Sequence, residues 1–116
     1  MAPRGAGSLY GMLDLLILKT LSTSGPLHGV EIANHISRLS DSTFHIEEGS
    51  LYPALHRLQN NEFVDWEWKS SEKGQRAKYY TLSPDGEKAF QSRMKGWIRN
   101  TRTMLKVLDL SMEVLQ

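Results

Sequence analysis

Side chains that can bind a polyanion gather in two short segments of this 116-residue chain. Between Lys69 and Tyr80 there are four basic residues and a single acid, together with a glycine. Between Ser50 and Arg57 the chain offers hydroxyl groups, an imidazole and a guanidinium. Such groups hydrogen-bond to phosphate oxygens and to base edges, and a guanidinium can form two parallel bonds to guanine or to phosphate. The pattern favours nucleic-acid recognition, with a solvated helix face and a soluble loop as the alternative.

The two halves of the sequence differ in charge, although the formal net charge is only +1. Residues 1–56 carry three bases and five acids, whereas residues 57–116 carry eleven bases and eight acids. Part of the basic excess lies between Lys88 and Lys106, where six bases occur without an acid. We expect these six bases to be spread around a helix and solvated, and contact with DNA or an anionic membrane is the alternative.

The residue content argues against several classes of protein. The chain has no cysteine, which excludes disulfides, thiolate metal sites and cysteine nucleophiles. It has no nucleophile elbow, P-loop or dinucleotide fingerprint, and its four histidines form no metal-ligand pattern with Asp or Glu. We therefore expect no enzyme, no cofactor and no metal site. The longest apolar stretch, residues 15–18, is far too short to cross a bilayer, so we expect no membrane partner, and the lack of cysteine fits a cytoplasmic protein.

Apolar periodicity predicts two helices in the first part of the chain. In residues 9–21 the apolar side chains cover more than one helical face, so this helix is expected to be covered on several sides. Gly25 and Pro26 then end it. Residues 30–39 give a second helix of about three turns. We expect residues 1–8 to be a flexible arm rather than a signal peptide, because they lack an apolar core.

A third helix is expected to start near residues 48–50. It carries Leu51, Leu55 and Leu58 at positions that share one apolar stripe. Its Pro53 is expected in the first turn, where the missing N–H has no partner inside the helix.

After the third helix the apolar period changes from 3.6 to 2. Val64, Trp66 and Trp68 alternate with polar residues, which predicts a half-buried strand, and residues 77–82 form a second strand. The polar loop of residues 70–76 between them makes a hairpin with a basic, flexible tip. The two tryptophans are expected in the core between sheet and helices, with exposed ligand platforms as the alternative.

The final segment has the signals of a long helix. Ser83 is a typical N-cap, and Pro84 suits the first helical position. Apolar residues then recur at spacings of three and four, and a helix reaching the chain end would be about 50 Å long. The preceding body cannot cover that length, so we expect a second subunit to do so. The residues expected at this dimer interface are Leu9, Met12, Leu13, Leu16, Phe90, Met94, Trp97, Met104 and Leu108.

Three helices, a two-stranded β-hairpin and a final helix describe a winged helix-turn-helix, which is mainly α in fold class. We assign residues 9–82 to this domain and residues 83–116 to a C-terminal dimerisation helix. In such a fold the third helix enters the major groove, and the hairpin reaches a neighbouring groove or the phosphates. The residues expected to contact double-stranded DNA are Ser50, Tyr52, Pro53, His56, Arg57, Lys73, Gly74, Gln75, Arg76 and Lys78.

Several motifs resemble those of one protein family. They are GSLYPALHRL at residues 49–58 and GQRAKYYTLSPDG at residues 74–86, preceded by LLIL at residues 15–18 and GPLHG at residues 25–29. In this order they resemble the PadR family of bacterial transcriptional regulators, and the short tail is similar to its compact subgroup. The resemblance implies a homodimeric DNA-binding repressor with interleaved first and last helices. A two-fold dimer would bind an inverted-repeat operator.

The chain departs from the family pattern at three places. Val30 stands where an aromatic residue is often found, and Gln75 where the hairpin often has a first arginine. The glycine that often ends the third helix is replaced around Asn61 and Glu62. We expect Asn61 to take the left-handed conformation there, so that the turn is kept.

The sequence also indicates a candidate regulatory site and an alternative function. The resemblance to the PadR family implies a ligand pocket, because in some members of that family an aromatic residue on the last helix lines a pocket for flat apolar molecules. Trp97, flanked by Met94 and Met104, is therefore a candidate site for a planar aromatic effector. The competing function is a winged-helix module for protein–protein contact without specific DNA binding. Glu47 and Glu48 favour it, because acids before the third helix repel phosphate.

Overall fold

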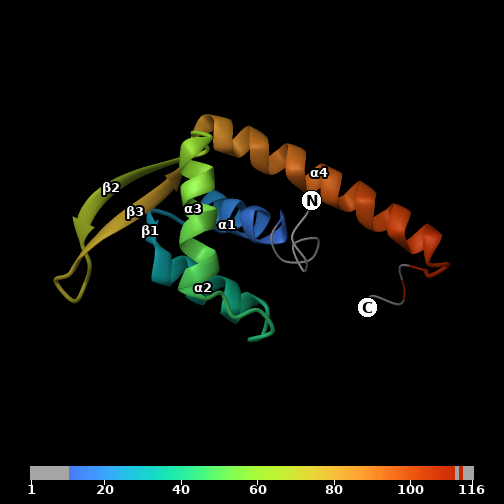
Figure 1. The fold of residues 1–116 in the computed structure, drawn as a ribbon, viewed down its shortest axis with the longest axis horizontal. Coiled ribbons are helices and arrows are strands. Elements are labelled where there is room, and N and C mark those ends of the chain that lie inside the picture. Colours follow the sequence, from blue (N-terminus) through green and yellow to red (C-terminus); the bar gives the residue numbers. More distant parts are fainter. Residues whose placement is uncertain (1–10, 112, 114–116) are drawn as a thin grey trace.

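The computed structural model describes residues 11–111 and 113, so Leu9 and the arm predicted for residues 1–8 lie outside the described residues. Within them, four helices and three strands follow one another (Figure 1). They are α1 (Gly11–Thr23), β1 (Leu27–His28), α2 (Gly29–Leu39), α3 (Glu48–Asn60), β2 (Val64–Ser70), β3 (Arg76–Leu82) and α4 (Pro84–Val107). The helices, the antiparallel hairpin and the long final helix confirm the predicted winged helix-turn-helix.

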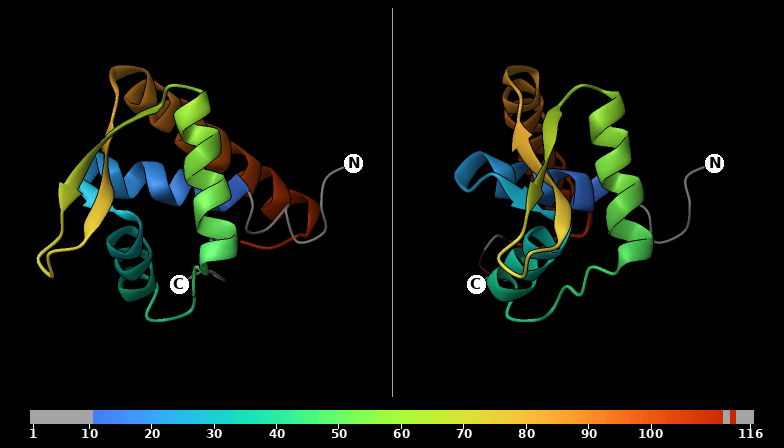
Figure 2. Two further views of the ribbon diagram at one scale, coloured as in Figure 1. Left: turned by 60° about the vertical axis from the view of Figure 1, so that its left-hand side comes forward. Right: turned by 90° about the vertical axis from the view of Figure 1, so that its left-hand side faces the viewer.

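Helix α1 is the centre of the hydrophobic core. It contacts α2, α3 and α4, and the views in Figure 2 show it crossing between them. The apolar stripe predicted on α3 is buried in the same cluster, so the apolar pattern located the core correctly. The largest fully covered side chains of these two helices are Leu13, Ile17, Leu18, Leu51, Leu55 and Leu58.

Two residues predicted at a dimer interface belong to this core. Leu13 is 1% exposed and Phe90 is 4% exposed within the single chain. The first half of α4 packs on α1, and the ammonium of Lys19 lies 5.8 Å from the centre of the Phe90 ring. Both side chains are therefore covered by their own chain and are not available to a second subunit.

The sheet has one strand more than the predicted hairpin. Strand β3 pairs with β2 on one side and with β1 on the other, both antiparallel, in the order β1-β3-β2. In β1, Leu27 pairs with Tyr80 and His28 with Tyr79. Two residues are too few to show a period of two in the sequence, which is why this strand could not be predicted.

The prediction that Trp66 and Trp68 are core residues was wrong. Trp66 is 38% exposed and Trp68 is 49% exposed, and only Val64 of strand β2 is buried. The helices cover the end of the hairpin where Val64 lies, and the rest of the hairpin extends beyond them (Figure 1). Alternation along the strand places the two tryptophans on one face correctly, but that face is largely open.

Helix α3 begins within the predicted range of residues 48–50, but two details of its prediction were wrong. It begins at Glu48, so Pro53 lies inside the helix instead of in its first turn. Because proline has no N–H, one backbone hydrogen bond of the helix is missing there. At the other end Glu62 takes the left-handed conformation, with φ of 61°, whereas Asn61 has φ of −85°. The N–H of Phe63 then donates to the carbonyl of Leu58 at 2.9 Å, which closes the turn without a glycine.

Helix α4 begins as predicted and ends earlier. The Ser83 hydroxyl accepts from the N–H of Gly86 at 2.9 Å and donates to the Glu62 carbonyl at 2.7 Å. The helix stops at Val107, because Asp109 takes φ of 57° and the N–H of Leu110 turns back to Leu105. Its 24 residues span about 36 Å, not the predicted 50 Å. Among the described residues, no helix is long and apolar enough to cross a membrane.

Gly86 should be essential for packing α4 on the end of α3. A Cβ placed there would lie 1.9 Å from the carbonyl oxygen of Phe63, a backbone atom that cannot swing aside. We predict that Gly86→Ala lowers the free energy of unfolding by about 1–3 kcal/mol or more in urea denaturation. Gly96→Ala is the matched control, since nothing lies within 4 Å of its Cβ and alanine favours a helix by up to about 1 kcal/mol. Equal losses in both variants would contradict this packing.

Candidate nucleic-acid interface

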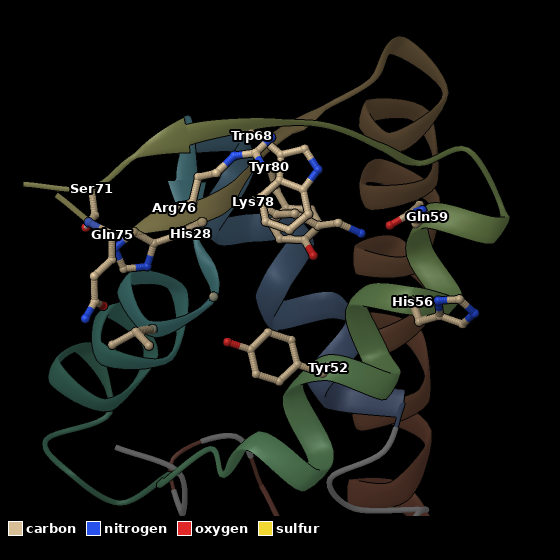
Figure 3. A pocket seen from close by; sticks show the side chains of 13 residues that line it. His28, Tyr52, His56, Gln59, Trp68, Ser71, Gln75, Arg76, Lys78 and Tyr80 are labelled. Carbon is tan, nitrogen blue, oxygen red and sulfur yellow. The ribbon is translucent and has the colours of Figure 1, made fainter.

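A hollow of about 470 Å³ opens between α3, the first turn of α2 and one face of the β2–β3 hairpin (Figure 3). Each of these elements brings polar or aromatic side chains to its wall. The residues that line it are His28, Gly29, Val30, Tyr52, His56, Gln59, Trp68, Ser71, Gln75, Arg76, Ala77, Lys78 and Tyr80.

Helix α3 presents Tyr52, His56 and Gln59 to the hollow. Their spacing of four and three residues places them on one flank of the helix, beside its buried stripe. The ring of Tyr52 lies over Gly29, where a Cβ would come within 2.9 Å of the tyrosine hydroxyl. Because Gly29 has no side chain, the tyrosine can pack on α2 and still be 43% exposed to a ligand.

His28 shapes the wall formed by α2. It is the N-cap of that helix, and its Nδ1 accepts from the N–H of Glu31 at 3.3 Å. In return the Glu31 carboxylate accepts from the N–H of His28 at 3.1 Å, which completes a capping box. The imidazole also meets the ring of Tyr79 edge-on at 5.2 Å. These contacts fix the first turn of α2 against the sheet, beside the hairpin.

The hairpin holds its cations on the side of the hollow. Cross-strand pairing sets Trp68 opposite Lys78, so their side chains share one face. The Lys78 ammonium lies 4.1 Å from the centre of the Trp66 ring, and the Arg76 guanidinium lies 4.9 Å from that of Trp68. Such cation–π contacts hold both charges near the indoles without neutralising them. By contrast, Lys69 pairs with the carboxylate of Glu67 at 3.2 Å.

The turn at the end of the hairpin is held by Ser71. Its hydroxyl accepts from the N–H of Gln75 at 3.2 Å, and its carbonyl accepts from the N–H of Gly74 at 2.8 Å. Gly74 has φ of 79°, which a residue with a side chain rarely adopts. Lys73 is exposed in this turn and does not line the hollow.

Tyr80 contributes a phenol at the back of the hollow. Burial raises the pKa of Tyr80 above its ordinary value of 10.0, and the neighbouring Tyr52 raises that pKa further. Its hydroxyl therefore stays protonated at neutral pH and can act as a hydrogen-bond donor.

Comparison with known proteins assigns this architecture to a family. The family model described as the transcriptional regulator PadR-like family matches residues 17–92. The chain belongs to the PadR-like family.

Solved structures of transcriptional regulators and one further protein sequence are similar to this chain over most of its length. A transcriptional regulator from Clostridium thermocellum is 28% identical, with a TM-score of 0.78 over 86% of this chain and 96% of the other. A PadR-like transcriptional regulator from Bacillus cereus is 25% identical, with a TM-score of 0.73 over 90% and 99% of the two chains. An uncharacterized protein of Lysinibacillus sphaericus is 29% identical over 93% of this chain and 94% of its own length.

Membership of the PadR-like family makes the chain a DNA-binding transcriptional regulator and not an enzyme, as predicted from its sequence.

Of the residues expected to contact DNA, the hollow brings together Tyr52, His56, Gln75, Arg76 and Lys78. The other expected residues do not line it, and they are Ser50, Pro53, Arg57, Lys73 and Gly74. Residues that line it without having been expected to contact DNA include His28, Gln59, Trp68 and Ser71. The spacing of Gln59 from Tyr52 and His56 could have revealed it.

Arg57 of this PadR-like protein points to the core side of α3 instead of the hollow. Its Nη2 lies 2.8 Å from Oδ1 of Asp14, and its Nε lies 3.5 Å from Oδ2. The Asp14 side chain is 12% exposed, and Nη1 of Arg93 lies 3.7 Å from its Oδ2. The guanidinium of Arg57 therefore holds α3 to α1, and the structure does not bring Arg57 into the hollow with the other residues expected to contact DNA.

We predict that Asp14→Ala destabilises the protein by about 1–3 kcal/mol in urea denaturation. The substitution leaves two guanidiniums without their shared carboxylate, and the value is below that for fully buried pairs because both arginines are partly solvated. The matched control is Glu67→Ala, which breaks a surface pair worth less than about 1 kcal/mol. If the two variants lose the same stability, Asp14 does not have this role.

Proposed function

We propose that this PadR-like regulator is a homodimeric repressor that binds an inverted-repeat operator in the cytoplasm. The observation that carries the proposal is the hollow, where cations of the hairpin and hydrogen-bonding groups of α3 face one space. A repressor needs both kinds of group, because phosphate contacts position a protein on DNA and base contacts specify the sequence.

Helix α3 is proposed to read the major groove. Gln59 can bond the N6 and N7 of adenine, and His56 can bond an acceptor on a neighbouring base. The Tyr52 hydroxyl is placed to donate to a phosphate oxygen. Ser50 and Pro53 lie nearer the N-terminal end of the same helix, where contact with the DNA backbone is proposed for them.

The hairpin is proposed to bind the phosphates of an adjacent groove. Arg76 and Lys78 can exchange their indole contacts for phosphate oxygens with little movement, because the rings hold them without hydrogen bonds. The turn residues Lys73, Gly74 and Gln75 are proposed to meet the minor groove or its phosphates.

We predict different consequences for substitutions on the two walls of the hollow. Arg76→Ala combined with Lys78→Ala should weaken binding to every duplex and reduce the slope of log K against log salt by about 1.8, since two phosphate contacts are lost. Gln59→Ala should cost about 1–3 kcal/mol on the selected site and relax the preference at one base pair. Fluorescence anisotropy at several salt concentrations, with a site selected from a random duplex pool, measures both effects.

Lys69→Ala is the control for the hairpin, because its ammonium pairs with Glu67 and does not line the hollow. It should change affinity less than twofold. Binding to random duplexes that lacks a salt slope would exclude the proposal and favour a protein–protein interaction module.

The dimer is proposed from the apolar side of α4. Trp97 is 47% exposed, Met104 61% and Leu108 58% in the single chain, which is unusual for side chains of this size on one helix flank. Met94 is partly buried, and Met12 and Leu16 of α1 are half-buried. Association would remove these surfaces from water, at about 1.5–3 kcal/mol for each large side chain fully covered.

Trp97→Glu is predicted to give monomers in sedimentation at micromolar concentration, because a carboxylate cannot be buried in an apolar interface without a partner. Ile98→Glu is the matched control, since Ile98 is 38% exposed on a different flank of α4, and this variant should remain dimeric. The dimer should protect half-sites whose centres lie one helical turn, about 34–36 Å, or a multiple of it apart. A monomeric wild type, or monomers in both variants, would contradict this interface.

Trp97 is also the proposed place for a planar aromatic effector. Its exposed indole offers a flat π surface, and the thioethers of Met94 and Met104 adapt to varied apolar shapes. An effector bound there can alter DNA binding only if it favours one arrangement of the two subunits.

A further inference from the structure

Five of the six bases on α4 lie on one side of the helix. Counted from Lys88, they recur after 7, 11, 14 and 18 residues, which keeps them within about 60° of one another on an α-helix. The expectation that these bases are spread around the helix was therefore wrong. All five are exposed, and we call them the basic row: Lys88, Lys95, Arg99, Arg102 and Lys106.

The charge of the basic row is not neutralised within the part of the chain that the structure describes. There is no acid between Lys88 and Leu108. None of the ion pairs of the described residues involves a member of the row, whereas the sixth base, Arg93, pairs with Asp14. Five like charges on one helix flank repel one another, so a polyanion that binds them would reduce this electrostatic repulsion.

The basic row faces away from the proposed dimer interface and stays accessible to solvent. At about 100° per residue, the row lies on the side of α4 opposite Trp97, Met104 and Leu108. It runs for about 27 Å, and its last four bases line a shallow groove together with Ile98 and Thr103. Helix α4 extends away from the hairpin to the other end of the molecule (Figure 1).

We propose that the basic row is a second, sequence-independent DNA-binding surface, which holds the phosphate backbone of duplex outside the operator. The inference rests on the proposed function, because it adds flanking or looped DNA to an operator already bound at the hollow. The row consists of cations alone, without the hydroxyl, imidazole and carboxamide groups that accompany the cations of the hollow, so we expect it to recognise the phosphate backbone by charge.

Charge density favours a duplex as the occupant. DNA carries one phosphate per about 1.7 Å of its axis with both strands counted, so a duplex segment as long as the row carries on the order of 16 phosphates, several for each cation. A helix that lies on a membrane inserts the apolar face opposite its charges into the lipid, and in the proposed dimer that face of α4, with Trp97, is covered by the second subunit. An acidic protein would need its carboxylates spaced to match this particular row.

The test compares salt-dependent binding of full-length variants to a 40-base-pair duplex of random sequence. Arg99→Gln combined with Arg102→Gln should weaken binding at least tenfold at low salt and reduce the slope of log K against log salt by about 1.8. Lys95→Gln combined with Lys106→Gln should do the same, which guards against a local effect of one pair on folding. The base preferences selected from a random pool should not change in either variant.

Two controls separate the row from general electrostatics. Arg99→Lys combined with Arg102→Lys keeps the charges and should bind within twofold of the wild type. Arg38→Gln combined with Lys69→Gln removes two exposed charges from α2 and from the hairpin, and it should also bind within twofold.

The outcomes distinguish this proposal from the proposed function. If both α4 neutral pairs bind like the wild type while the Arg76 and Lys78 substitutions weaken binding, the row is not a DNA surface and the hollow still is. If the hairpin substitutions also have no effect, the proposed function fails as well. If the α4 variants lose binding to phosphatidylglycerol vesicles or polyglutamate and keep binding to DNA, the occupant is a membrane or an acidic protein and the proposal is overturned.

Discussion

The carboxylate of Asp14 ties together the three helices on which the DNA-binding surface is built. It projects from α1 in the core and accepts hydrogen bonds from Nε and Nη2 of Arg57 on α3. The guanidinium of Arg93 on α4 lies near it. A carboxylate at this depth needs cationic partners, because burial of an unpaired charge is costly. The pairs therefore constrain the position of α3 on α1 more narrowly than the surrounding leucines, which many packings would satisfy.

The rotation of α3 about its own axis follows from that contact. With Arg57 held toward α1, the opposite flank turns Tyr52, His56 and Gln59 toward the hairpin. The hairpin meets them with a face set by cross-strand pairing, on which Trp66 and Trp68 hold the cations of β3. A partly buried ion pair and an open aromatic face thus position the two walls of one hollow.

The periodic spacing of apolar residues and the helix-capping residues predicted most of the fold. The stripe of Leu51, Leu55 and Leu58, the Ser83 cap and the two long strands were all located correctly. Errors arose where a tertiary contact decides the outcome. Whether Trp68 is buried depends on how far the helices reach along the hairpin, and no local period encodes that distance.

The candidate site was predicted in part for the same reason. Polar residues off the stripe of α3 were grouped together, although they lie on two flanks of the helix. The helical period separates Arg57 from Tyr52 and His56, but only the partner Asp14, 43 positions away in the chain, shows which flank faces the core. On α4 the period alone would have revealed the basic row, because five bases recur there at helical spacing.

DNA bound in the hollow must contact Trp68 and leave Trp97 unaffected. The three indole N–H groups of Trp66, Trp68 and Trp97 give separate ¹⁵N–¹H signals, which Trp→Phe variants assign. In a titration of the full-length protein with duplex DNA, we predict that the Trp68 signal shifts in proportion to occupancy. The Trp97 signal should stay in place, since its indole lies on the far side of α4 from the basic row. A shift of Trp97 with an unmoved Trp68 would contradict binding in the hollow.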